Sequence, residues 1–328
     1  MIACFSGGSN MQGLCAVFKK ELSDHFTSHR FVILFALIAM VSVITSHMAG
    51  IYLKETWDLA STRFPFLLLF SVPGGLFSMI QFVAFFGPLI GIVLGFDSIN
   101  RERAEGTLIK LVSQPIHRDA VINGKFLAGA ATITIMLVAI VLSIAGLGMI
   151  LVGIVPTIEE IFRLLTCLIM SVFYVSFWLG ISMLFSVLFK GIATSALASV
   201  ALWIFLSFFV SLGAEVVGDA VVPVDRQEEV PPEMLIKNVR TKEMFSLFSP
   251  MVLYRDATAT IIDPMRKTTR SLILMGPMEE LLTSRFQNPL PLAQSIIVVF
   301  PHMTALISIT LICFAFSYLA FMVQEIRS

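Results

Sequence analysis

The sequence predicts an all-α integral membrane protein with six transmembrane helices. Hydrophobic residues make up 57% of its 328 residues and charged residues only 13%, whereas roughly a quarter of the residues in soluble domains are charged. A helix needs about 20 apolar residues to cross the hydrocarbon core, because each residue adds about 1.5 Å. Six stretches meet this requirement: Phe31–Leu53, Leu76–Phe96, Phe126–Val155, Leu164–Phe189, Ile192–Ala214 and Leu292–Val323.

The distribution of Lys and Arg predicts a multi-pass protein of the cell membrane with both termini in the cytoplasm. Short loops rich in Lys and Arg stay on the cytoplasmic side, whereas long loops cross largely regardless of charge. The long segment 215–291 is therefore left out of the comparison. Ten Lys and Arg residues fall on the side of the termini: Lys19, Lys20, Arg30, Arg101, Arg103, Lys110, Arg118, Lys125, Lys190 and Arg327. Three fall on the other side: Lys54, Arg63 and Arg163.

The spans divide the chain into four predicted parts. They are a cytoplasmic N-terminus (1–30), spans one to five (31–214) with a charged cytoplasmic loop (97–125), an extracytoplasmic domain (215–291), and the sixth span with a cytoplasmic C-terminus (292–328). In the first part, Met11–Arg30 places Leu14, Phe18 and Leu22 at helical spacing. This pattern predicts an amphipathic helix that lies in the cytoplasmic interface, in contact with membrane lipid. A disordered polar tail is the alternative.

The extracytoplasmic domain is expected to be helical. Three of its segments begin at Pro or Ser-Pro, which suits the first turn of a helix. They are Pro231–Phe248, Ser249–Ile262 and Pro277–Phe286. Small residues in the fifth span, among them Thr194 and Ala198, predict a close-packing face that suits either a second subunit or a contact within the chain.

The charged loop between the second and third spans is the most informative segment. Gly106 and Thr107 form a break and a cap, and Leu108 and Leu111 give the following residues one apolar face. Pro115 ends this short helix, because the residue before Pro is pushed out of the helical region. Such a helix under the membrane offers a surface that a peripheral protein can grip. The alternative is an anchor that touches only lipid headgroups.

The same loop resembles a pattern typical of ABC-2 type transporter permeases, ER-x-x-GTL-x-x-LLS-x-P-x-x-R…GK. Within that family the chain is similar to the six-span branch that includes nitrous-oxide-reductase maturation permeases. Val112 stands where the pattern has its second Leu. Residues 18–22 resemble the elbow helix of the family, and residues 245–250 resemble its Ser-Pro element before the last span. The matching loop residues are Glu102, Arg103, Glu105, Gly106, Thr107, Leu108, Leu111, Ser113, Pro115, Arg118, Gly124 and Lys125.

The resemblance implies a transmembrane permease subunit that binds two cytoplasmic ABC ATPase subunits and a second permease subunit, as a homodimer or a heterodimer. It also implies that the charged loop is the coupling element, with Leu108 and Leu111 as apolar knobs for a groove on the ATPase. The polar rim of these knobs would be Arg101, Glu102, Arg103 and Glu105. The remaining residues of the coupling set are Gly106, Thr107, Pro115 and Arg118.

The chain is expected to be no enzyme, because it lacks the phosphate-binding pattern GxxxxGK[ST]. Gly124 and Lys125 are preceded by Asp119 where the first Gly would stand, and Phe126 replaces the hydroxyl residue that binds magnesium. ATP and magnesium are therefore expected on a separate ATPase subunit, and no cofactor on this chain.

Export of a substrate suits the family better than import, and two other functions stay open. An ABC-type complex that transmits conformational change to an extracytoplasmic protein partner, without transport, is the first. The second is an ion-coupled secondary transporter, which usually needs ionisable residues inside the membrane. The six predicted spans contain no Asp, Glu, Lys or Arg, which disfavours this class.

Other chemistries find little support in the sequence. Glu159-Glu160 with Arg163 is similar to the EExxxR pattern of membrane proteases, but the spacing is wrong by one residue. His25 and His29 share a helix face without a third ligand nearby, and the four Cys residues form no CxxC pair. Lys plus Arg and Asp plus Glu both number 22, so no excess of positive charge favours nucleic acid.

Overall fold

The computed structural model describes residues 9–56, 64–71, 78–107, 117–221, 232–264 and 289–324, and within these ranges the protein is helical without β-strands. Six helices are long and apolar enough to cross a membrane, which confirms the predicted number. They are α2 (His29–Thr56), α3 (Met79–Gly95), α6 (Arg118–Val152), α7 (Ile158–Leu188), the continuous helix α8 (Ile192–Ile204) to α9 (Val210–Val221), and α13 (Leu292–Val323).

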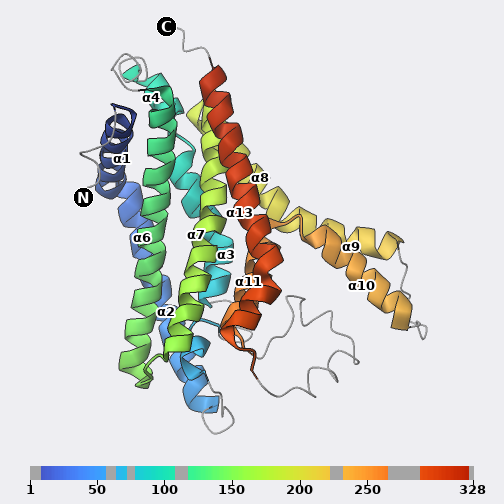
Figure 1. Ribbon diagram of the computed structural model, residues 1–328. Helices are drawn as coiled ribbons and strands as arrows, with labels where there is room; N and C mark the ends of the chain where they lie inside the picture. The colour runs from blue at the N-terminus through green and yellow to red at the C-terminus, as the bar shows by residue number, and fades with distance from the viewer. Residues whose placement is uncertain are drawn as a thin grey trace.

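Two of these helices, α3 and α7, form the centre of the bundle (Figure 1). The most apolar stretch of each is 67% buried within the chain, whereas the corresponding stretches of the other four spans are 17% to 28% buried. Since lipid tails are themselves apolar, the four outer spans can leave most of their surface to lipid or to another subunit. The first and the last described helices meet at one end of the bundle: helix α1 (Ser9–Thr27) and the last turn of α13 are at the end that also carries α4 (Asn100–Ala104). We name this the α4 end.

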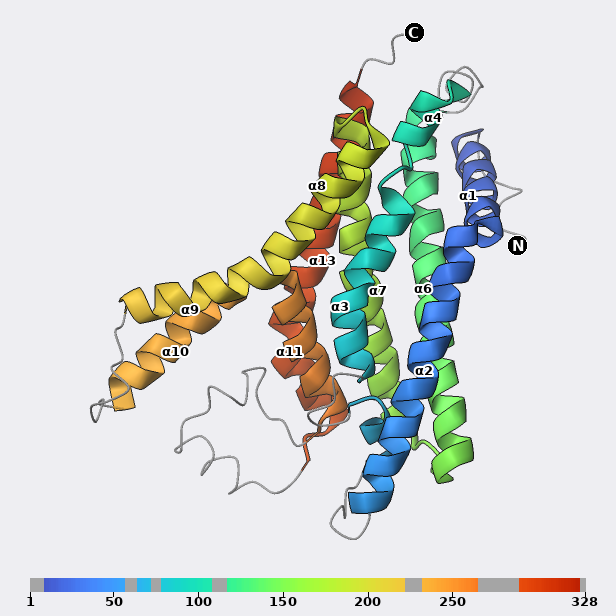
Figure 2. The ribbon, with the colours of Figure 1, turned by 180° about the vertical axis from the view of Figure 1, so that it is seen from behind.

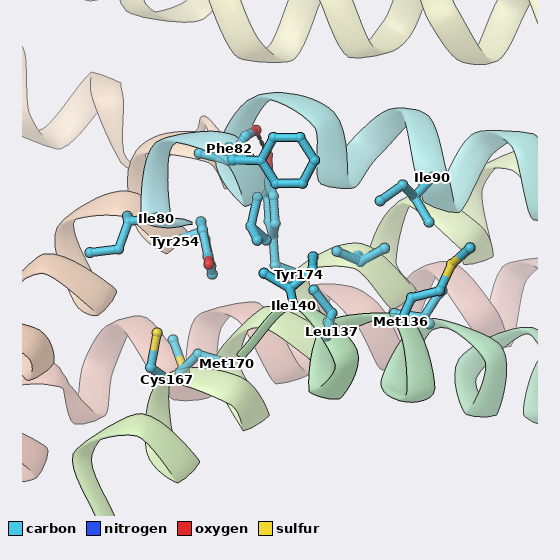
Figure 3. Packing of buried hydrophobic residues seen from close by; sticks show 14 of the residues in the cluster. Ile80, Phe82, Ile90, Met136, Leu137, Ile140, Cys167, Met170, Tyr174 and Tyr254 are labelled. Carbon is cyan, nitrogen blue, oxygen red and sulfur yellow. Dashed lines mark hydrogen bonds between the residues drawn. The ribbon is translucent and has the colours of Figure 1, made fainter. Parts of the chain in front are cut away.

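Proline in the middle of α3 is accommodated by a side chain of α7. Pro88 has no N–H to donate to the carbonyl of Ala84, the residue one turn before it. The hydroxyl of Tyr174 donates to that carbonyl oxygen instead, at 2.7 Å. Figure 3 shows Tyr174 among buried apolar side chains, close to Ile140 of α6. Helix α3 thus continues through Pro88 with the Ala84 carbonyl hydrogen-bonded in an apolar interior.

Close contact between α3 and α7 depends on glycine. A Cβ atom on Gly91 would lie 2.6 Å from the backbone oxygen of Val175 and 2.9 Å from the backbone nitrogen of Leu179. Only a residue without a side chain allows the two backbones to approach this closely.

Helix α11 (Pro250–Ile262) packs inside the bundle, against α7, α13 and α3. The ring of Tyr254 stacks on Tyr174 with centroids 4.5 Å apart, and the Tyr254 and Ser171 hydroxyl oxygens are 2.8 Å apart. The helix matches the predicted segment Ser249–Ile262, and its place in an extracytoplasmic domain stays a prediction. Its apolar residues, such as Leu253, Ala257 and Ile261, are buried against these helices.

Helices α9 and α10 (Pro232–Ser246) form an antiparallel pair that projects from the side of the bundle (Figure 2). A π-helical turn, Phe205–Phe209, connects α8 to α9. The Asn238 amide donates to the carbonyl of Gly218 at 3.0 Å, and Lys242 pairs with Asp219 at 2.6 Å. Helix α10 matches the predicted segment Pro231–Phe248, whereas the predicted helix Pro277–Phe286 lies outside the described residues. The boundaries of an extracytoplasmic domain stay a prediction.

Helix α7 begins earlier than the apolar pattern suggests. Thr157 caps it, and Glu160 completes a capping box by accepting from the Thr157 backbone N–H at 2.8 Å. The first helical residue is therefore Ile158, six positions before the predicted start at Leu164. Arg163 was expected in a loop and lies in this helix instead.

Arg163 is fully buried and joins three parts of the chain at the end opposite α4. Its guanidinium donates to the carbonyl of Ile261 at 2.9 Å, to the carbonyl of Leu290 at 2.5 Å and to the hydroxyl of Ser295 at 3.2 Å. It also pairs with Glu159 at 2.9 Å. These bonds fix the end of α11 and the beginning of α13 to α7, and they satisfy a charge that burial would otherwise make costly.

Candidate functional site

The candidate site lies at the α4 end, where the chain turns from α3 into α4 and then into α6. Helix α4 ends in a tight turn at Gly106, whose φ of 66° favours glycine. The predicted coupling residues Leu108, Leu111 and Pro115 lie outside the described residues. What the structure describes is how the two sides of that segment are attached to the bundle.

The beginning of α4 is fixed to α7 by hydrogen bonds. Ser186 accepts from the backbone N–H groups of Ile99 and Asn100 at 3.0 and 3.1 Å. The side-chain amide of Asn100, fully buried, donates to the carbonyl of Gly191 at 3.3 Å. Two bonds to α7 and one to Gly191, the residue that precedes α8, leave α4 little freedom to move independently of these helices.

Two predicted coupling arginines converge on the last described residue, Gln324. The guanidinium of Arg103 donates to the side-chain oxygen of Gln324 at 2.6 Å, and that of Arg118 donates to its backbone carbonyl at 3.3 Å. The amide of Gln324 donates in turn to the carbonyl of Val187 at 3.1 Å. Because Arg103 and Arg118 lie on opposite sides of the segment 108–116, both sides of that segment are tied to the end of α13 and to α7.

The predicted polar rim divides into inward and outward residues. Glu102 is buried and pairs with Lys125 of α6 at 2.9 Å, and Thr107 donates to the Glu102 carbonyl at 3.2 Å. Arg101 and Glu105 instead pair with each other one helical turn apart, at 2.9 Å, with side chains 61% and 54% exposed. Glu102 and Arg103 therefore hold the segment, whereas Arg101 and Glu105 are available to a partner.

A cleft of about 870 Å³ lies beside α4, between α1, α3 and α6. Arg30 of α2 pairs with Asp97 at 2.7 Å on its wall and lies over the ring of Phe96, 5.1 Å from the ring centroid. His25 also lines the cleft, and burial there lowers the pKa of this histidine below its ordinary value. Among the described residues, no group of three or more His, Cys, Asp or Glu side chains could hold a metal ion.

Several residues of this site do not belong to the predicted coupling set. Lys125 carries a signal in the sequence, because it belongs to the Gly-Lys pair of the family pattern, and Asp97 follows directly after the second apolar stretch. Ser186 and Gln324 carry none, since a polar residue at a span end is equally consistent with a solvent-facing position.

Comparison with known proteins identifies the family. The model of the ABC-2 family transporter proteins matches residues 15–326, almost the whole chain. The chain is also 30% identical over 89 residues to the probable ABC transporter permease protein NosY of Pseudomonas aeruginosa. That match covers 27% of this chain and 31% of the relative, so less than a third of the relative's length is spanned. On the match along almost its full length, this multi-pass membrane protein belongs to the ABC-2 family of transporter proteins.

Proposed function

We propose that this chain is the transmembrane permease subunit of an ABC exporter, driven by separate cytoplasmic ATPase subunits. The observation that carries the proposal is the attachment of the coupling segment at the α4 end. Arg103 and Arg118 tie both of its sides to Gln324, while Arg101 and Glu105 stay exposed. When a partner pushes on this segment, the helices that are bonded to the segment move as well.

The attachment favours coupling over a passive lipid anchor. A segment that only rests on headgroups needs no fixed geometry, because lipid adapts to it. Here the backbone before α4 is bonded to Ser186 of α7, and α7 is one of the two most buried spans. A displacement at α4 therefore reaches the centre of the bundle directly.

The proposed orientation places the α4 end and both termini in the cytoplasm, as the Lys and Arg distribution predicts. ATP and magnesium bind to the ATPase subunits in this proposal. The membrane partner is a second permease subunit, identical or related. The α8–α9 helix suits this contact, because it is the least buried span and has the small residues Thr194 and Ala201 on its exposed face.

Transmission to an extracytoplasmic protein is the second candidate function. The projecting pair α9–α10 favours it, since α10 continues into α11 and α11 is bonded to the central helix α7 through Tyr254 and Ser171. A protein that contacts α9–α10 would then be linked to the same helices as the ATPase. Both functions use the same ATPase interface. They differ in whether a substrate crosses the membrane.

The experiment is co-purification of the ATPase with a permease carrying Leu108→Asp and Leu111→Asp. If both residues are buried in a groove of the ATPase, each substitution loses about 1.5 to 3 kcal/mol of apolar burial, and the added charge makes the loss larger. We expect the ATPase to be lost while the permease still inserts. Val155→Asp with Ile158→Asp, at exposed positions of the opposite end, is the matched control and should retain it. Full retention by the Leu108/Leu111 variant would exclude this segment as the coupling element.

A further inference from the structure

A single buried ammonium group connects three elements at the α4 end. The Nζ atom of Lys125, in α6, lies 2.8 Å from Glu21 of α1 and 2.9 Å from Glu102 of α4. The Lys125 side chain is 3% exposed, and both carboxylates are 12% exposed. Helix α1 is thereby joined to the beginning of the coupling segment through a residue of the third span.

Helix α1 also packs closely on α6 beside this group. A Cβ atom on Gly124 would lie 2.8 Å from a methyl carbon of Val17, and Val17 is 4% exposed. The glycine therefore permits a contact that any larger residue would push apart. Both views of the ribbon place α1 beside the first turns of α6 (Figures 1 and 2).

The charges of the cluster are mutually dependent. Lys20 adds a second ammonium 3.0 Å from Glu21, with its side chain 53% exposed. Burial alone would raise the pKa of Glu21, but Lys125 and then Lys20 outweigh it and hold that pKa below its ordinary value. Removal of Lys125 would leave Glu21 and Glu102 with only the half-exposed Lys20, 3.0 and 3.7 Å away, to balance their charges. Replacement of a buried ionic cluster by uncharged residues of similar volume is often neutral for stability.

We propose that α1, the beginning of α6 and α4 move as one body when the ATPase acts, and that Lys125 is the positioning residue that holds them together. This inference rests on the proposed permease function. It gives α1 a role in transmission, because a helix that only lay in the membrane interface would need no bond to the coupling segment. The ATP-driven displacement of α4 is then delivered to the third span and to α1 at the same time.

The test uses the assembled complex and a neutral variant, Glu21→Gln with Glu102→Gln and Lys125→Met. This triple variant avoids the unpaired charge that could prevent Lys125→Met alone from folding. Spin labels on cysteines at Ser23 and Ala104, both exposed, report the distance between α1 and α4 with and without ATP. We expect that distance to be unchanged by ATP in the native complex and to change in the neutral variant. We also expect ATP hydrolysis by the variant complex to fall about tenfold, which corresponds to about 1.4 kcal/mol in the activation free energy.

The control is Lys19→Met, which removes an exposed lysine side chain of α1 outside the cluster and should keep both the constant distance and the hydrolysis rate. A neutral variant that melts at the native temperature, binds the ATPase and shows native distances and turnover would overturn the role of Lys125. Absence of the ATPase from the native preparation would overturn the proposed function and this inference together. Failure of the role of Lys125 and failure of the proposed function therefore give different results.

Discussion

The hydroxyl of Tyr174 donates a hydrogen bond to the carbonyl oxygen of Ala84, which Pro88 leaves without its helical partner. The bond links the two central helices, α3 and α7, at a point where a proline would otherwise leave a buried polar group unpaired. The ring of the same tyrosine stacks on Tyr254 of α11. One side chain therefore takes part in the contacts among three helices.

Tyr174→Phe should lower the free energy of unfolding by about 1 to 3 kcal/mol, because it removes the hydroxyl that donates to the buried Ala84 carbonyl while keeping the ring. Thermal unfolding in detergent measures the effect, with the half-buried Tyr318→Phe as control. In a Pro88→Ala background, where the backbone N–H is restored, the loss should be smaller. An equal loss in both backgrounds would mean that the Ala84 bond contributes nothing to stability.

Arg163→Gln should destabilise the end of the bundle opposite α4. The variant loses bonds to Ile261 and Leu290 and leaves their carbonyls without this donor. We expect a loss of about 3 kcal/mol, typical of breaking a buried charged contact. Arg255→Gln, an exposed arginine on α11, is the matched control and should change the melting temperature little. Comparable melting of the two variants would contradict the buried role of Arg163.

The stability of the α1 contact should depend on pH through Glu21. Since Lys125 and Lys20 hold the folded-state pKa of Glu21 below its ordinary value, its ionic contribution is complete above the unfolded value, about 4.3. It is lost as the pH falls through the folded value. The difference in melting temperature between the native chain and Glu21→Gln should be constant from about pH 6 to pH 8 and should shrink below about pH 4. A difference in melting temperature that grows on acidification would contradict a stabilising role of ionised Glu21.

Cysteine labelling checks the proposed orientation. In a chain with its four native cysteines replaced, Lys190→Cys should be shielded from an impermeant thiol reagent in intact cells, and Ile158→Cys should react. Both positions are exposed at opposite ends of the bundle. Both should react after the membrane is permeabilised, which controls for accessibility. If only Lys190→Cys is labelled in intact cells, the orientation is the opposite of the proposed one.

The number of spans could be predicted because each one is a long apolar run, but two helix starts could not. Helix α6 begins at Arg118 and α7 at Ile158, ahead of the predicted Phe126 and Leu164. The polar residues that precede the apolar stretch of each helix have distant partners, such as Glu21 for Lys125 and Leu290 for Arg163. A hydropathy pattern contains no information on such partners.

The position of α11 and the division of the coupling residues also needed the structure. The sequence predicts α11 as a helix of the long segment 215–291, but its packing against α3, α7 and α13 can be seen only in the structure. In the coupling set, charge alone cannot separate Glu102, which pairs with a buried lysine, from Glu105, which pairs at the surface. The family pattern locates the segment, and tertiary contacts assign its residues.

Site-specific photo-crosslinking tests the central claim most directly, that the α4 end meets an ABC ATPase. A photoreactive amino acid replaces Arg101, whose side chain is 61% exposed, and in a matched variant Ile158, which is 76% exposed at the opposite end. With a co-expressed ABC ATPase, we expect a crosslink from position 101 that mass spectrometry identifies as that ATPase, and none from position 158. Crosslinking of the ATPase from position 158 and not from position 101 would contradict the account.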